Sequence, residues 1–148
     1  MKLPRTCTNK GFTLIEILIT LGIFVILASL GLYVSLDSYR SYTFSSERDA
    51  LVSLLLKARN QSMNNIDELP HGVHIGSQSF TLFEGVTYSV SNPKNNIIAR
   101  NAAISVNGLT DVNFSQLSGD PSLIGSITLS YGARTAIISI ENEGRINW

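Results

Sequence analysis

A long apolar run near the N-terminus dominates the pattern of hydrophobic and polar positions along the chain. It covers 25 residues from Phe12 to Leu36, and its only ionisable groups are the carboxylate of Glu16 and the phenol of Tyr33. A helix of that length rises about 37 Å, enough to cross a hydrocarbon core of about 30 Å with some tilt. The pattern therefore predicts a transmembrane helix over residues 12–36.

An amphipathic segment follows this run without an intervening proline. The residues that share one face at helical spacing are Phe44, Leu51, Leu54, Leu55, Ala58 and Ser62. The polar residues between them are Arg48, Asp49, Lys57 and Arg59. This alternation predicts that the helix continues through residues 37–65, to about Met63, with the apolar stripe packed on a sheet and the charges in solvent.

Short alternating segments separated by Gly, Asn and Pro replace the helical pattern over residues 66–148. The predicted strands are 72–75, 79–83, 86–90, 97–99, 103–106, 112–114, 126–130 and 135–140. Asn107-Gly108 is expected to close the strand before it, and 117–122 to form a loop. The fold class is therefore predicted to be α+β, with one long helix packed against a small, mostly antiparallel β domain.

Composition and charge predict how the chain is oriented in the membrane. The chain has 148 residues with 11 basic and 11 acidic side chains. Three basic residues precede Gly11, so the rest carries eight basic against 11 acidic side chains. A basic N-terminal flank favours a cytoplasmic N-terminus, with everything after Leu36 across the membrane. Cys7 is the single cysteine, so residues 12–148 cannot form an internal disulfide.

Glu16 is the unusual residue of the membrane segment. A carboxylate costs about 2.5 to 3.5 kcal/mol near the bilayer centre and less toward an interface. Glu16 lies about 6 Å along the helix from Phe12, so the cost is reduced but not abolished. We expect a positive partner for this carboxylate.

The segment Lys10-Gly11-Phe12-Thr13-Leu14-Ile15-Glu16 resembles the leader of type IV pilins and pseudopilins. The resemblance implies that residues 1–11 are a leader, that a prepilin peptidase cuts after Gly11, and that the new amine of Phe12 is methylated. It also implies that Glu16 neutralises the amine of Phe12 on an adjacent subunit. A plain signal anchor and a cleaved secretory signal are the alternatives.

The C-terminal half is similar in pattern to FimT/GspH-like minor pseudopilins. FimT-like minor pilins bind DNA through a Gly-Arg-x-Arg element, and Gly144-Arg145-Ile146-Asn147 stands at that place with the second arginine missing. Arg134 and Arg145 could form a small basic patch beside Trp148, which offers a stacking surface. The alternative is a basic hairpin tip next to a terminal aromatic residue.

The sequence shows no enzyme motif, and we expect neither catalysis nor a cofactor. His71 and His74 are three apart in a predicted strand, so they should point to opposite faces and not share a metal. A calcium site among Glu141, Glu143, Asp120 and Asp111 is a further alternative, but these acids are scattered along the chain. No metal site is predicted.

The sequence thus predicts a minor pilin or pseudopilin held in the inner membrane and assembled into a filament. Its expected partners are other pilin subunits, the prepilin peptidase and an inner-membrane assembly platform. The alternatives are a DNA-binding minor pilin and a single-pass anchored module that does not polymerise.

Overall fold

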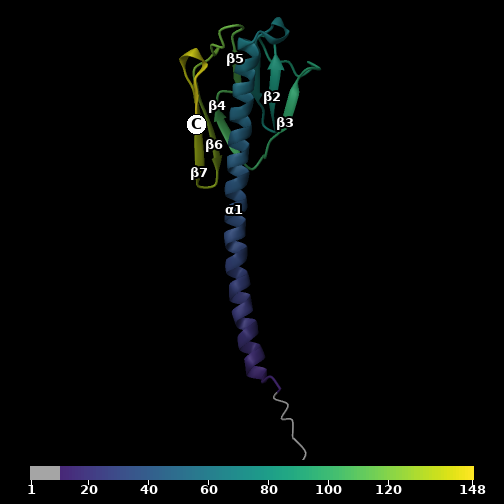
Figure 1. Cartoon of the computed structure of the whole chain (residues 1–148), viewed down its shortest axis with the longest axis vertical. Coiled ribbons are helices and arrows are strands. Elements are labelled where there is room, and N and C mark those ends of the chain that lie inside the picture. The colour runs from purple at the N-terminus through teal and green to yellow at the C-terminus, as the bar shows by residue number, and fades with distance from the viewer. Residues whose placement is uncertain (1–10) are drawn as a thin grey trace, which may run out of the picture. The chain divides into compact units, whose positions relative to one another are not determined.

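The structure is a computed structural model that describes residues 11–148, except for the side chains of residues 33 and 34. The expected leader therefore lies outside the described residues, apart from Gly11. The chain divides into two compact units, of which the second runs from Tyr42 to Trp148. One helix, α1, extends from Leu14 to Met63 and contributes to both units (Figure 1). The predicted helix end near Met63 is confirmed.

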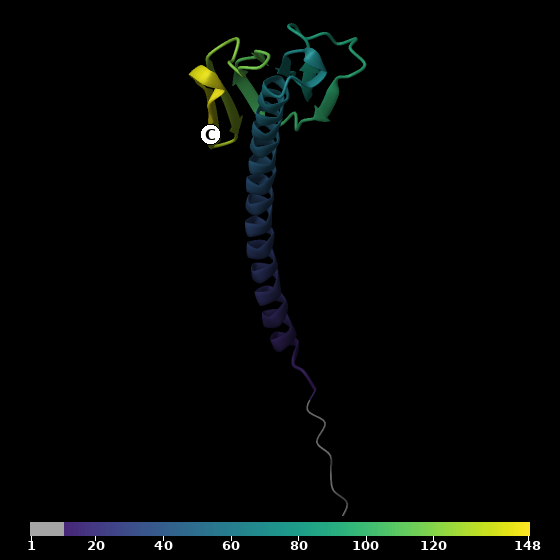
Figure 2. The same ribbon diagram turned by 45° about the horizontal axis from the view of Figure 1, so that its top comes forward.

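Eight strands form two four-stranded antiparallel sheets in the unit from Tyr42 to Trp148. The first sheet has the order β3-β2-β1-β5, and its strands are β1 (His71–Ile75), β2 (Ser79–Glu84), β3 (Asn96–Ala99) and β5 (Asp111–Phe114). The second has the order β4-β6-β7-β8, and its strands are β4 (Ser105–Gly108), β6 (Gly125–Tyr131), β7 (Arg134–Ile140) and β8 (Ile146–Asn147). The two sheets lie on either side of the C-terminal half of α1 (Figures 1 and 2). The predicted α+β class is confirmed.

One core joins the helix to both sheets. Every member of the predicted helical stripe is buried, including Leu51, Leu55 and Ala58 at 0% exposure. From the first sheet the core takes Val73, Ile75, Phe80, Leu82, Val112 and Phe114, and from the second Ile127, Leu129, Ile138, Ile140 and Ile146. Burial of these apolar side chains is the main stabilising contribution to this unit.

Polar contacts fix the end of the helix against β1. Ser62, the last member of the stripe, is buried, and its Oγ accepts the His71 backbone N–H at 2.8 Å. The Ser62 carbonyl accepts the N–H of Leu117 at 2.9 Å. A short 3-10 turn, η1 (Ile66–Glu68), connects α1 to β1, and Asn65, Asp67 and Glu68 in this connection have positive φ.

Three local predictions were wrong. No strand forms over residues 86–90, because Asn113 Nδ2 donates to the carbonyls of Gly85 and Val86 at 3.1 and 2.8 Å, in place of a neighbouring strand. Asn107 and Gly108 belong to β4, with Gly108 opposite Ile127, so they do not close the strand. Arg59 is half-buried, and its Nη2 donates to the Glu143 carbonyl at 2.7 Å, so it is not on the solvent face.

Candidate functional site

The helix begins immediately after Thr13, and this residue caps it. Thr13 Oγ1 accepts the backbone N–H of Glu16 at 3.3 Å, and the Thr13 carbonyl accepts the N–H of Ile17 at 3.2 Å. Thr at the cap and Glu three residues later is the sequence arrangement of a capping box. The helix dipole also favours a carboxylate in the first turn, where Glu16 lies. The local sequence therefore sets both the start of the helix and the position of Glu16 in its first turn.

Gly11 and Phe12 precede the helix as exposed, non-helical residues. Phe12 is 79% exposed, and Gly11 is exposed as well. The peptide bond between them is therefore open to a peptidase, which needs an extended and accessible segment to cut. The structure thus puts the predicted cleavage site on accessible backbone.

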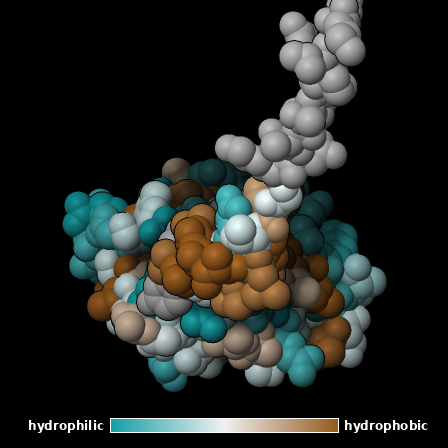
Figure 3. Space-filling model, turned by 90° about the horizontal axis from the view of Figure 1, so that it is seen from below, coloured by the Kyte–Doolittle hydropathy of each residue, from teal (hydrophilic) through white to brown (hydrophobic). Residues whose placement is uncertain are grey.

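Glu16 is surrounded along the helix by exposed apolar side chains. The apolar residues of the first half of α1 that are at least half exposed include Ile15, Leu18, Ile19, Leu21, Phe24, Val25, Ile26, Leu27, Leu30 and Leu32. Figure 3 shows a group of apolar side chains that lie next to one another, as seen from below. Of the helices in the described part of the chain, α1 alone is long and apolar enough to cross a membrane.

The hydroxyl groups of this apolar segment bond within the helix. Thr20 Oγ1 donates to the carbonyls of Glu16 and Ile17, each at 2.9 Å, and Ser29 Oγ donates to the Ile26 carbonyl at 2.8 Å. Such bonds make a hydroxyl compatible with an apolar environment. The Glu16 carboxylate has no comparable partner among residues 11–148, the part of the chain that the structure describes.

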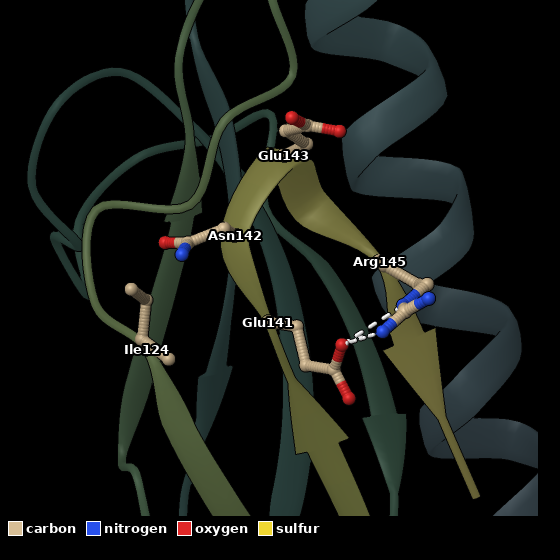
Figure 4. Close-up of a pocket in the computed structure, with 5 residues that line it drawn as sticks. All are labelled: Ile124, Glu141, Asn142, Glu143 and Arg145. Carbon is tan, nitrogen blue, oxygen red and sulfur yellow. Dashed lines mark hydrogen bonds and ion pairs between the residues drawn. The ribbon is translucent and has the colours of Figure 1, made fainter.

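Glu141 and Arg145 face one another at the C-terminal tip (Figure 4). Arg145 Nε donates to Glu141 Oε2 at 2.9 Å, Arg145 Nη2 forms an ion pair with the same oxygen, and Asn147 Nδ2 donates to Glu141 Oε1 at 2.6 Å. Ile124, Asn142 and Glu143 complete a hollow of about 470 Å³ around this pair. The negative charge next to Arg145 reduces its attraction for a phosphate.

The three residues considered for DNA binding do not form one patch. Arg134 begins β7, whereas Arg145 follows the turn after the other end of this strand. The seven residues of β7 separate the two positions by about 20 Å. Trp148 follows β8 and is 61% exposed. Arg145 and Trp148 therefore flank β8, whereas Arg134 lies at the other end of β7.

The two histidines lie in β1 on opposite faces, as predicted. His74 Nδ1 lies 2.7 Å from Asp111 Oδ1, and its ring stacks on Tyr88 with centroids 3.9 Å apart. His71 is 4% exposed and lies opposite Glu84 of β2. Of the acids considered for calcium, Asp111 is thus engaged by His74 and Glu141 by Arg145, while Glu141 and Glu143 line the same hollow.

Sequence reasoning missed Glu141 as the partner of Arg145. The available signal was the opposite charge four residues away, but that spacing brings side chains together in a helix and not in a strand. Here the turn η2 (Asn142–Gly144), in which Glu143 and Gly144 have positive φ, reverses the chain between β7 and β8. The reversal brings the ends of the two strands together, and with them the two side chains.

Comparisons with known proteins bear on the N-terminal segment. A comparison with curated proteins and one with solved structures each found no match. The prokaryotic N-terminal methylation motif matches residues 7–32, which include Gly11, Phe12 and Glu16. This motif implies processing by prepilin peptidase and assembly with other pilins. Over these residues the chain carries the leader motif of type IV pilin and pseudopilin precursors.

Proposed function

We propose that the chain is the precursor of a minor pilin or pseudopilin, a structural subunit that is cut between Gly11 and Phe12 and methylated at Phe12. The observation that carries the proposal is the capped helix start. It leaves the cleavage site as accessible backbone and puts a carboxylate that has no partner among residues 11–148 one turn into an apolar helix. The matched methylation motif supports the same roles for these residues.

The apolar half of α1 anchors the subunit in the inner membrane. The basic residues before Gly11 favour a cytoplasmic N-terminus. The unit from Tyr42 to Trp148 then lies across the membrane, where it contacts neighbouring subunits. No described residue of this unit needs to act chemically for such a role.

Glu16 directs assembly in this proposal. After cleavage the amine of Phe12 is the positive charge nearest in depth to Glu16. Two opposite charges about 4 Å apart attract several times more strongly in an apolar medium than in water. An unpaired buried charge is costly. A neighbouring subunit that brings its amine to Glu16 therefore removes, for both groups, the free-energy cost of an unpaired charge in an apolar environment.

Two glycines give the apolar helix a close-packing surface. Apart from the adjacent residues and the backbone of the helix itself, no atom of the described residues lies within 4 Å of the Cβ positions of Gly22 and Gly31. Small residues allow membrane helices to approach one another closely. Both positions are therefore open to a neighbouring helix.

The test is incorporation of a Glu16→Gln variant into filaments in the native cell. We expect incorporation to fall at least about tenfold, because glutamine cannot neutralise the amine and a lost charge pair is worth more than about 1.4 kcal/mol in an apolar medium. Asp49→Asn is the matched control, since Asp49 lies on the same helix outside the apolar run and is largely exposed. Equal incorporation of Glu16→Gln and the parent chain would contradict the role of Glu16.

Intact-mass measurement of the membrane form separates this proposal from a non-polymerising anchor. We expect the mass of residues 12–148 with one added methyl group in cells that contain the peptidase. A chain that retains residues 1–11 in such cells would contradict the processing step.

A further inference from the structure

A second cluster of ionisable side chains lies beside β1 and β2, away from the N-terminal site. Asp67 of η1, His71 of β1 and Glu84 of β2 each offer one ligand atom, and these atoms all lie within 4.8 Å of one another. The register pairs His71 directly with Glu84. The cluster borders a hollow of about 180 Å³ whose lining also includes Gln61 and Lys94.

Two polar atoms of this hollow are buried and unpartnered. His71 is 4% exposed, and its Nδ1 has no hydrogen-bond partner among the described residues. Gln61 Oε1 is also buried and without a hydrogen-bond partner among the described residues. Buried polar atoms in folded proteins are nearly always bonded, so these two atoms require a partner, either a bound ligand or an ordered water.

The two carboxylates already attract a cation. Lys94 Nζ lies 3.0 Å from Glu84 Oε2 and 3.6 Å from Asp67 Oδ2. The Lys94 ammonium thus lies beside both carboxylates of the cluster. The Lys94 side chain is 55% exposed, however, and an exposed ion pair contributes little. A divalent ion with stronger ligand bonds can therefore displace the ammonium.

We propose that Asp67, His71 and Glu84 bind a divalent transition-metal ion of the zinc type, which takes the place of the Lys94 ammonium. An imidazole nitrogen with two carboxylate oxygens suits zinc, whereas calcium and magnesium select oxygen ligands alone. Ligand bonds of about 2.1 Å place the atoms around zinc about 3 to 4 Å apart. Asp67 is the exposed member of the cluster, so its side chain is the one that would adjust to reach that spacing.

The experiment is a zinc titration of the full chain in detergent against a coloured chelator that competes for the ion. Cys7 is replaced by serine throughout, so that no thiol contributes. We expect saturable binding of one zinc ion per chain. Asp67→Asn and Glu84→Gln should each weaken it at least about tenfold, because each removes one ligand charge. Glu68→Gln, an exposed neighbour outside the cluster, should leave the affinity unchanged.

Lys94→Met should change the zinc affinity in the opposite direction from Asp67→Asn and Glu84→Gln. It removes the competing ammonium from an exposed position, so zinc should bind more tightly than to the parent chain. Equal affinity would overturn the displacement of Lys94. Absence of binding by both the parent and Lys94→Met would overturn the site, and so would zinc binding that survives Asp67→Asn and Glu84→Gln. Melting curves without zinc check that each variant is folded.

Discussion

A largely buried ion pair connects the helix to the segment between the two sheets. Glu47 Oε1 accepts the backbone N–H of Asn101 at 3.1 Å and lies 3.6 Å from Arg100 Nε. The side chains of Glu47 and Arg100 are 12% and 6% exposed. Arg100 also donates to the Gly76 carbonyl at 2.9 Å and lies 5.6 Å from the centroid of the Phe80 ring. Both charged groups therefore have several partners.

The pKa of Glu47 predicts how the stability of the unit depends on pH. Burial raises this pKa above its ordinary value of 4.5, against the opposing effects of Asn101 and Arg100. Between the ordinary and the raised pKa, the folded protein binds more protons than the unfolded chain. The Glu47 contribution to the free energy of unfolding is then fully present below pH 4.5 and lost as the pH rises through the raised pKa.

Urea unfolding of the parent and of Glu47→Gln across this pH range tests the prediction. In Glu47→Gln the free energy of unfolding should not show this decrease with rising pH, because glutamine does not titrate. Glu143→Gln, a change at an exposed position, should keep the slope of the parent. If the parent and Glu47→Gln had the same pH dependence, the raised pKa would be wrong.

At the scale of elements, the turn η2 is fitted closely against α1 and the loop before β6. Gly144 has φ +70°, and a Cβ there would lie 2.3 Å from the Gly119 carbonyl oxygen and 2.5 Å from Arg59 Nε. Gly119 is in turn close to Met63. These approaches leave no room for a side chain.

Gly144→Ala should therefore destabilise the protein by at least about 2 kcal/mol, from the left-handed backbone and the clash with a carbonyl oxygen together. Gly132→Ala is the matched control, since Gly132 has φ +60° but, apart from its adjacent residues, no described atom within 4 Å of its Cβ position. The control should cost about 1 kcal/mol from the backbone alone. Chemical denaturation measures both, and equal losses would show that the close approach contributes nothing.

Elements with a long, regular pattern could be predicted from the sequence. The helical stripe ended at Ser62 as expected, because burial on one side repeats with the period of the helix. The segment 86–90 has strand composition but no strand, because its neighbouring carbonyls bond to the Asn113 side chain, a tertiary contact that no local pattern contains. Arg59 reaches Glu143, which is 84 residues away.

The same limit applies to the candidate sites. Gly11, Phe12 and Glu16 lie within six residues, so the resemblance of this short segment to a pilin leader was enough to predict processing and assembly roles for them. Asp67, His71 and Glu84 meet only because η1 turns the chain and β1 pairs with β2. His71 looked like an ordinary strand residue in the sequence, since its carboxylate neighbours are set by strand register.

At the scale of the molecule, the unit from Tyr42 to Trp148 has a core of its own. About 100 residues with a continuous core are enough for independent folding. A chain that begins at Tyr42 should therefore be soluble without detergent and show one cooperative urea transition by circular dichroism. A gradual loss of signal would contradict this independence, and the full chain in detergent provides the reference midpoint.

The C-terminal residue supplies an optical reporter for this protein. Trp148 is the single tryptophan of the chain and is 61% exposed just after β8. Its fluorescence therefore arises from one known place and is open to collisional quenchers such as acrylamide. Coverage of that tip by a neighbouring subunit would shield the indole from the quencher, so assembly can be followed by light without an attached dye.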